Sequence, residues 1–395
     1  MAPKTVTLDG PELATIKARL RAGNDATLKA ALAVLTAEAD SWLGQGPWSV
    51  VTKSRPFPSG DKHDYVSQAP YFWPDPAKPE TGGRPYIQRD GEKNPEVLEY
   101  TDRVYVEKVF RASYTLALAW YYTDNAAYAQ HAAAILRTWF VVPDTAMNPH
   151  LNHAQLIPGV NTGRGIGIID FAQAYASTLD AAAILADAPT TTATTWTADD
   201  DAGFRRWNTS FLHWLVHSDF GRTEHAEPNN HGSFAAMLIA TIAAYVGDTA
   251  QARAEAQFVR RLLATTLGPD GSQPAELRRT RSWHYSTFNL QALTRLAMVA
   301  DRVEGTAVDS GGRVWDLLYK PIEYILPAAV EGPSRWQYPD LKFQRFAAAD
   351  IVRAAARAGH AASQAAVDRL ELPPDGDLWP LRPAPEQLDP VKADV

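Results

Sequence analysis

The 395-residue sequence contains no cysteine. Disulfides, a thiolate nucleophile and zinc–thiolate sites are therefore all excluded. The sequence also lacks any run approaching ~20 uninterrupted apolar residues, so we expect no membrane span. No signal peptide is visible in the polar sequence after Met1, and we expect a periplasmic or secreted location whose leader is not seen here.

An excess of positive charge is missing as well. Lysine and arginine number 38 against 45 acidic residues, which gives a formal net charge of −7. A nucleic-acid-binding protein normally presents a basic field to phosphates, so we exclude nucleic acid as a partner. An anionic substrate would have to meet a local basic patch. With 46% hydrophobic and 21% charged residues, the chain is globular and not disordered.

The alternation typical of β-strands is scarce, whereas helix-length segments separated by short connectors are frequent. We expect helices near residues 11–43 (broken at Gly23-Asn24-Asp25), 101–123, 125–140, 165–187, 200–217, 230–246, 248–267, 283–303, 312–330, 340–358 and 360–370. About a dozen helices form six to seven antiparallel hairpins, and no repeat of fixed length favours a solenoid. The prediction is an all-α single domain over residues 1–395, an (α/α) toroid or incomplete barrel whose mouth is walled by loops.

Two segments stand apart from this helical pattern. Residues 44–100 are rich in proline and glycine but also carry many aromatic side chains. So long a connection is usually functional or disordered, and its aromatic content argues against disorder. We interpret it as an ordered lid over a groove, although a loop that merely caps the core is the alternative. Residues 372–395 are proline-rich and acidic and are expected to form a surface tail.

Two polar clusters bracket a pair of expected helices. The first is Asn229-Asn230-His231-Gly232-Ser233, and the second runs from Glu276 through four basic residues to Tyr285. A tight helix hairpin would bring the two clusters together. A structural interpretation exists for each: an asparagine can simply cap a helix, and the arginines can form a solvated helix end with Glu276 as partner. A protein of net negative charge, however, has little reason to concentrate cations beside aromatic residues unless they meet an anion, and arginine suits a carboxylate best.

These side chains suit β-elimination on a 4-linked uronate. The hydrogen on C5 becomes acidic only when the adjacent carboxylate is neutralised, which Asn230 and Arg279 can do. A base must remove that proton and an acid must protonate the leaving O4. We expect nearby cations to lower the pKa of the Tyr285 phenol from about 10, so that Tyr285 can serve as base and then acid on glucuronate or mannuronate. On guluronate, where the two groups leave from opposite faces, His231 is the better base.

Other chemistries are weaker in this sequence. A glycoside hydrolase needs two carboxyl groups facing a sugar, and the candidates, which are Asp61, Asp64, Asp170, Glu224 and Glu227, stand in no distinctive motif. Metal sites are conceivable at His150 with His153, or at His225, Glu227 and His231, but the first lacks an obvious carboxylate ligand. The glycine-rich run at residues 163–167 follows no strand, which argues against nucleotide binding. We expect no metal and no cofactor.

Several blocks of the sequence, in order, carry a resemblance to a known family. They are Asp64 to Pro74, Pro85 to Gly91 with Asn94-Pro95-Glu96, Met147 to Asn152 followed by Gln155, Gly159 and Gly163-Arg164-Gly165, Asn229 to Gly232, and Glu276 to Ser286. Together they resemble the alginate lyase superfamily of helical toroids, including its glucuronan (cellouronate) lyase relatives. The resemblance covers roughly residues 60–300.

The resemblance implies an (α/α) toroid that cleaves a β-1,4-linked polyuronate by metal-independent β-elimination. It places carboxylate neutralisation on Asn230 and Arg279, with Arg278 as the alternative arginine, and the base and acid roles on His231 and Tyr285. It assigns substrate binding to Tyr65, Tyr71, Trp73, His150, Gln155, Arg164 and His284. The expected partner is an acidic polysaccharide, with no membrane partner and a monomeric protein. A hydrolase of uronate oligosaccharides and a non-catalytic carbohydrate-binding protein are the alternatives.

Overall fold

A computed structural model describes residues 2–53, 55, 58–77, 85–187, 196–305 and 312–386. Its α-helices are α1 (Gly10–Ala22), α2 (Ala26–Trp42), α3 (Thr101–Thr123), α4 (Ala126–Phe140), α5 (Ile169–Ala172), α6 (Tyr175–Ala186), α7 (Ala198–His217), α8 (Asp219–His225), α9 (Asn230–Val246), α10 (Thr249–Thr266), α11 (Pro274–Leu277), α12 (Ser282–Glu304), α13 (Val314–Glu331), α14 (Ala349–Arg357) and α15 (Ala361–Ala366). None of these helices is long and apolar enough to cross a membrane.

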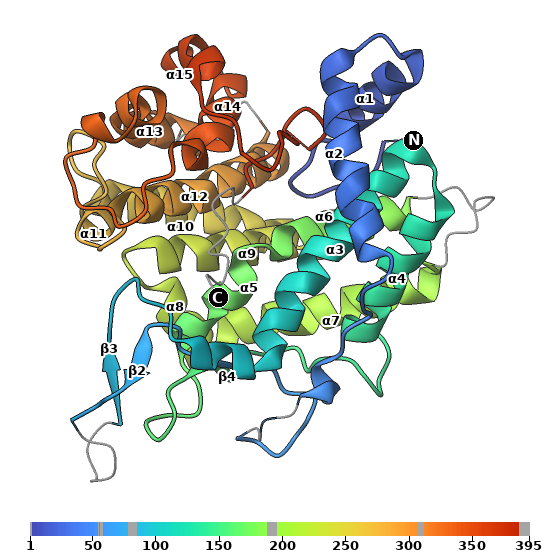
Figure 1. The fold of residues 1–395 in the computed structure, drawn as a ribbon, viewed down its shortest axis with the longest axis vertical. Helices are drawn as coiled ribbons and strands as arrows, with labels where there is room; N and C mark the ends of the chain where they lie inside the picture. The colour runs from blue at the N-terminus through green and yellow to red at the C-terminus, as the bar shows by residue number, and fades with distance from the viewer. Residues whose placement is uncertain are drawn as a thin grey trace.

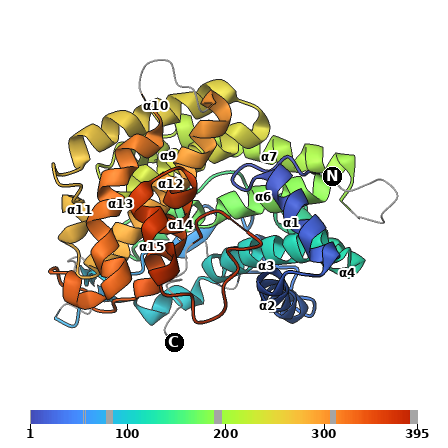
Figure 2. The same cartoon turned by 90° about the horizontal axis from the view of Figure 1, so that it is seen from above.

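The helices form an incomplete ring of inner and outer members, which confirms the predicted (α/α) toroid (Figures 1 and 2). The inner helices are α3, α6, α9 and α12. Helix α3 packs against α6, α6 packs against α9, and α9 packs against α12. The outer helices α2, α4, α7, α10 and α13 cover them from outside. Burial follows this division: α9 is buried along almost its whole length, whereas α10 buries only a stripe that includes Ala252, Ala256 and Val259. An apolar helix and an amphipathic one are the two patterns expected for inner and outer positions.

The expected helix bounds agree with the structure wherever capping signals are clear. Asp25 caps α2 by accepting a hydrogen bond from the Leu28 backbone N–H, and α9 ends at Gly247, whose φ of 93° favours glycine. The single helix expected at 165–187 is instead a 3-10 turn followed by α5 and α6. The short helices α8 and α11 were not predicted, because seven and four residues are too few to show a helical period.

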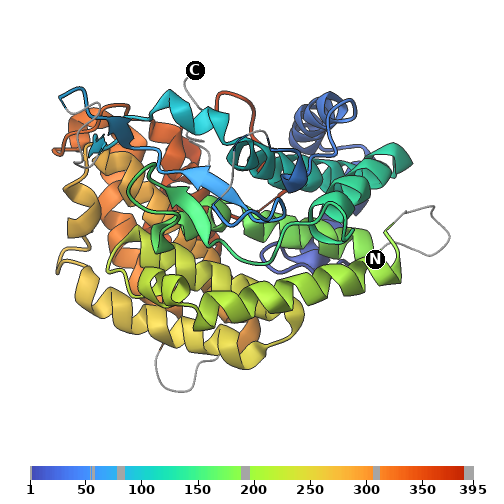
Figure 3. The ribbon, with the colours of Figure 1, turned by 90° about the horizontal axis from the view of Figure 1, so that it is seen from below.

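The described part of the segment at residues 44–100 forms an arm with three short strands. Strand β1 (Val66–Gln68) pairs in parallel with β4 (His153–Leu156), as Figure 3 shows. Strands β2 (Phe72–Pro74) and β3 (Tyr86–Gln88) form an antiparallel hairpin, with Trp73 opposite Ile87. The part of the predicted lid at residues 78–84 lies outside the described residues. The described part of this hairpin lies at the end of the ring that contains α8 and α11 (Figure 1).

The predicted surface tail needs a correction. Residues 381–385 are buried, with Leu381 at 0% exposure, although residues 387–395 lie outside the described part of the chain. Arg382 contacts Asp350 of α14 at 3.2 Å, and Tyr122 of α3 donates a hydrogen bond to the Leu381 carbonyl oxygen at 2.6 Å. This segment therefore contacts both an early and a late helix of the ring. Its proline-rich composition predicted a surface tail and did not indicate these buried contacts.

Candidate active site

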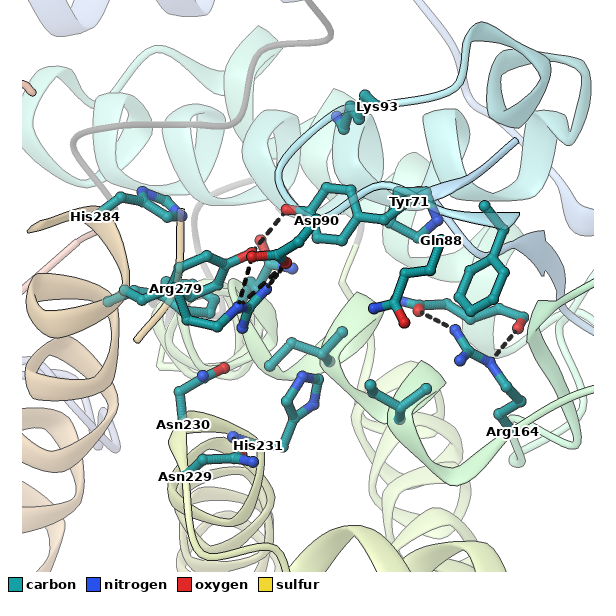
Figure 4. A pocket seen from close by; sticks show the side chains of 18 of the residues that line it. Tyr71, Gln88, Asp90, Lys93, Arg164, Asn229, Asn230, His231, Arg279 and His284 are labelled. Carbon is teal, nitrogen blue, oxygen red and sulfur yellow. Dashed lines mark hydrogen bonds and ion pairs between the residues drawn. The ribbon is translucent and has the colours of Figure 1, made fainter. Parts of the chain in front are cut away.

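A pocket of ≈ 380 Å³ opens where the arm meets the ends of the inner helices (Figure 4). It is lined by Pro70, Tyr71, Phe72, Gln88, Asp90, Lys93, Arg103, Gln155, Arg164, Ile166, Ile169, Gln173, Asn229, Asn230, His231, Arg279, His284, Tyr285 and Phe288. These residues come from the arm, from the start of α3, from β4 and the turn after it, from α5 and the residue that follows it, from the start of α9, and from the α11–α12 connection with the start of α12. The two polar clusters singled out in the sequence thus meet in one pocket.

Three residues at the start of α9, namely Asn229, Asn230 and His231, line the pocket (Figure 4). Asn229 caps the helix, because its side-chain oxygen accepts the His231 backbone N–H at 2.8 Å. A Cβ atom at Gly232 would lie 2.0 Å from the Glu227 carbonyl oxygen, so only glycine permits this tight turn into the helix. Asn230 and His231 therefore occupy the first turn at a fixed angle. Both asparagines line the pocket, and Asn229 is also the cap of the helix.

His231 is paired with a buried carboxylate. Its Nδ1 lies 2.6 Å from Oε1 of Glu224, whose exposure is only 2%. Burial raises the pKa of Glu224 above its ordinary value, and the charge and hydrogen bond of His231 oppose that rise. Within the described chain no hydrogen-bond partner contacts Nε2, the other ring nitrogen of His231, and the ring lines the pocket.

Asn230 is held by a second buried carboxylate, Glu276 of α11. The Asn230 backbone N–H donates to Oε1 of Glu276 and its Nδ2 donates to Oε2, both at 2.7 Å. Burial raises the pKa of Glu276, whereas its two hydrogen bonds from Asn230 oppose the rise. Glu276 had been considered as a partner for the neighbouring arginines. In the structure it orients the amide of Asn230 instead.

Arg279, and not Arg278, points into the pocket. Arg278 is exposed to solvent and does not line it. The guanidinium of Arg279 lies over the Tyr285 ring, 3.6 Å from its centroid, and its Nε and Nη2 donate to the carboxylate of Asp90 on the arm. Its Nη1 has no hydrogen-bond partner in the described chain. An acid from the arm thus occupies one side of this arginine, which the sequence had not indicated.

Tyr285 corrects one expectation about the chemistry. The residue is only 5% exposed, and its hydroxyl lies 2.9 Å from that of Tyr71 on the arm. Burial raises the pKa of Tyr285 well above its ordinary value, and the neighbouring Tyr71 adds to the rise, while Arg279 only partly opposes it. We expected a lowered pKa because cations are close by. Desolvation outweighs them, so the group rests as a neutral phenol.

Arg164 lies across the pocket from Arg279 (Figure 4), and its hydrogen-bond partner Gln155 also lines the pocket. Gln155 has a positive φ of 48°, unusual for a residue other than glycine, and its Nε2 donates to buried Asp170 at 2.8 Å. Arg164 donates to the backbone and side-chain oxygens of Gln155 and lies over the Phe72 ring, 5.1 Å from its centroid. Among the described residues no carboxylate forms an ion pair with Arg164. The pocket therefore contains a second guanidinium that an anion can reach.

Of the predicted site residues, Asn230, His231, Arg279, Tyr285, Tyr71, Gln155, Arg164 and His284 line the pocket. Tyr65, Trp73 and His150 do not. Tyr65 has 0% exposure and donates to Asp170 at 3.1 Å, which corrects our expectation that its ring contacts a substrate. Trp73 lies on the hairpin against Arg89. His150 lies 3.1 Å from Asp64, an anchor for the base of the arm.

Sequence reasoning assigned no role to several pocket residues. Gln88, Asp90 and Lys93 reach it from the arm, and Gln173 and Phe288 from the helices. Asp90 stood in a recognised block, but its partner Arg279 is 189 residues away. No local pattern could have shown this contact.

The carboxyl groups named in the alternative interpretations lie elsewhere. Asp90 is the acid among the described lining residues, and it is paired with Arg279. Asp170 is held by Tyr65, Ser67 and Gln155. Among the residues that the structure describes, no group of three or more histidine or acidic side chains is arranged to hold a metal ion. The geometry thus supplies no pair of carboxyl groups facing a sugar.

Comparisons with known proteins agree with this geometry. The family model described as "Alginate lyase" matches residues 49–336. The chain is similar to a crystal structure of an alginate lyase from Bacteroides ovatus, with 31% identity, a TM-score of 0.87, and coverage of 97% of this chain and 100% of that one. Alginate lyase A1-III from Sphingomonas species A1 shares the fold, with 16% identity, a TM-score of 0.58, and coverage of 96% and 97%. No curated protein matches the chain.

Proposed function

Because this chain belongs to the alginate lyase family, we propose that it cleaves a β-1,4-linked polyuronate by β-elimination that needs no metal ion. Family membership supports polysaccharide lyase activity in general. The leading polymers are mannuronate-rich alginate and glucuronan (cellouronate). The Bacteroides ovatus relative is described as an alginate lyase, which makes alginate the first polymer to test.

The proposed reaction breaks the bond between C4 and O4 of a uronate. A base removes the proton from C5, next to the C6 carboxylate. The electrons of that C–H bond form a C4–C5 double bond while the C4–O4 bond breaks, and O4 takes a proton from an acid. One product carries a 4,5-unsaturated uronate and the other a restored hydroxyl group. No oxidant, reductant or water is consumed.

Neutralisation of the C6 carboxylate falls to Arg279 and Asn230. Arg279 has a free Nη1 beside its contact with Asp90, and Asn230 keeps its second amide hydrogen when the first is bound to Glu276. Both donors are fixed before a substrate arrives, which is the condition for strong electrostatic stabilisation of developing charge. The neighbouring guanidinium of Arg164 suits the carboxylate of another sugar in an acidic polymer.

The proton transfers are proposed for His231 and Tyr285. His231 directs a nitrogen without a partner into the pocket, so it is suited to remove the C5 proton. Tyr285 rests as a neutral phenol and is suited to protonate O4. On mannuronate or glucuronate the two groups leave from the same side of the sugar, and on guluronate from opposite sides. Comparing these polymers therefore tests the assignment of base and acid.

The observation that carries this proposal is the convergence of Asn230, His231, Arg279 and Tyr285 in one pocket. A glycoside hydrolase is less well supported, since it needs two carboxyl groups facing the scissile bond and the pocket's acid, Asp90, is paired with Arg279. A binding protein without catalytic activity would not need an unpartnered imidazole nitrogen in the same pocket as a phenol. We propose a monomeric enzyme with a periplasmic or secreted location, where long acidic polymers are accessible.

The experiment is a spectroscopic assay on three separate polymers: mannuronan, guluronan and oxidised cellulose. A lyase produces a conjugated double bond that absorbs in the ultraviolet, and a hydrolase produces only new reducing ends. We expect absorbance to rise on mannuronan or oxidised cellulose and to persist after exhaustive chelation. Reducing ends without absorbance would replace the lyase by a hydrolase. Activity lost on chelation and restored by one divalent ion would overturn the metal-free mechanism.

A further inference from the structure

Glu224 is a buried acid that contacts the pocket only through another side chain. It does not line the pocket, and its side chain is 2% exposed. It lies on α8, a seven-residue helix between α7 and the turn that starts α9. Its hydrogen-bond partner is Nδ1 of His231 at 2.6 Å. A buried carboxylate is unfavourable without a charged or hydrogen-bonded partner. Burying Glu224 here therefore depends on His231, and we ask what this pairing does for His231.

When Glu224 is ionised, its contact with Nδ1 determines which nitrogen of His231 carries a proton. An ionised carboxylate can only accept hydrogen bonds, so Nδ1 must be the donor. In the neutral ring the other nitrogen, Nε2, then carries a lone pair. Since Nε2 has no partner in the described part of the chain and the ring lines the pocket, that lone pair is available to a substrate.

We propose that Glu224 is a positioning residue for the lyase reaction, which holds His231 in the Nδ1–H form so that Nε2 faces the sugar as a base. The inference rests on the proposed function, because it names the group that prepares the proposed base. Without Glu224, the neutral ring is free to place its proton on Nε2, the form that imidazoles prefer in water. That form cannot accept the C5 proton. For histidines that bind metal ions, losing the acid that orients the ring typically costs about 10- to 100-fold in affinity or activity, and we take the same scale for His231.

The protein contains a second pair of the same kind that serves as a control. Nε2 of His225 lies 2.6 Å from Oε2 of Glu255, which is 4% exposed. The His225 ring lies against Phe258, 3.8 Å between centroids, and does not line the pocket. Both pairs join a buried glutamate to a histidine near the start of α9. Only one of them reaches the substrate site.

Three variants separate positioning from general stability: Glu224→Leu, Glu224→Gln and Glu255→Gln. Leucine has similar size but no acceptor, whereas glutamine keeps an acceptor oxygen for Nδ1–H. We expect kcat to fall about 100-fold in E224L and about tenfold in E224Q, with KM changed less than about twofold. E255Q should keep the wild-type kcat. Equal losses in E255Q and E224Q, or full activity in E224L, would overturn the proposal.

A second readout does not depend on activity. In protein with ¹⁵N-labelled histidine, the ring nitrogens of His231 report which one is protonated, and H231A identifies the signals. We expect protonated Nδ1 and free Nε2 in the wild type, and a shift towards protonated Nε2 in E224L. A wild-type spectrum with protonated Nε2 would refute the positioning role. If the wild type releases no unsaturated product from any polymer, the proposed function fails, and the spectra still test the contact by themselves.

Discussion

The two walls of the pocket are held in different ways. On the helical wall, Asn230 and His231 are anchored by Glu276 and Glu224, whose exposures are 1% and 2%. On the arm wall, Tyr71 and Asp90 reach across to Tyr285 and Arg279. The Arg279–Asp90 pair remains partly exposed, at 26% and 28% for the two side chains.

This difference assigns different tasks to the two walls. Side chains with buried, hydrogen-bonded partners keep one geometry, which is what proton transfer and charge stabilisation require. Contacts that are partly open to water contribute less energy and exchange more readily with a ligand. We therefore expect changes on the helical wall to act on kcat and changes on the arm wall to act mainly on KM. Four experiments test this comparison, from the largest expected effect to the smallest.

The largest effect is expected at Tyr285. Tyr285→Phe removes the proposed acid, and general acid catalysis contributes about 10²- to 10⁴-fold, so kcat should fall by that order. Binding of an alginate tetrasaccharide, measured by calorimetry, should remain close to wild type. Tyr71→Phe removes the hydroxyl 2.9 Å away and is the matched control, with a smaller loss expected. A near-wild-type rate for Y285F would show that Tyr285 is not the acid.

Glu276→Ala should come next. It leaves two donors of Asn230 without their partner in a buried place, and an unsatisfied buried donor costs about 1–3 kcal/mol. We expect that loss in the free energy of unfolding from urea titrations, together with a fall in kcat of about tenfold. Glu276→Gln keeps an acceptor and should lose less of both. If E276A retains its kcat despite being destabilised, Asn230 has no part in the chemical step.

Asp90→Ala tests the arm wall. Asp90 competes with a substrate carboxylate for Arg279, and a partly exposed ion pair is worth ~0.2–1 kcal/mol. KM should therefore fall by up to about fivefold on an acidic polymer, with kcat little changed. The measurement is a steady-state series at two salt concentrations. A rise in KM would mean that Asp90 holds Arg279 in its binding position and does not compete.

The smallest effect concerns pH and stability. Burial raises the pKa of Glu276 above its ordinary value of 4.5. A carboxyl group with a raised folded pKa contributes stability that is present below the unfolded value and is lost as the pH rises through the folded value. The contribution of Glu276 to Tm should therefore fall as the pH rises above 4.5, so the wild type should lose more Tm over that rise than Glu276→Gln. Parallel Tm curves for the two proteins would contradict the raised pKa.

The sequence was most informative about side chains that lie next to a residue marking the start or end of a helix. The bounds of α9 were predicted within a residue of the structure, because Asn229 caps its start and Gly247 follows its end. The position of Asn230 and His231 follows from the predicted start of α9, since the first turn of this inner helix faces the mouth of the ring. The toroid itself was predicted from about a dozen helices joined by short connectors into hairpins, without a repeat of fixed length.

Contacts between distant segments were beyond sequence reasoning. Asp90 and Arg279 are 189 residues apart, and Glu276 looked like a partner for nearby arginines although it binds Asn230. Tyr65 resembled a sugar platform because it stands among loop aromatics, yet it is completely buried. The pKa of Tyr285 was predicted with the wrong sign because charge can be read from neighbouring residues, whereas desolvation depends on packing.

The segment at residues 381–385 has a consequence for how the molecule is made. It packs beside Tyr122 of α3 and Asp350 of α14. The residues that connect these two parts of the ring are therefore synthesised after both of them. During translation, the surface of α3 around Tyr122 that this segment covers stays exposed until the ribosome has added some 260 further residues. We expect a nascent chain arrested before residue 376 to engage chaperones that bind apolar surface, and the released chain to leave them.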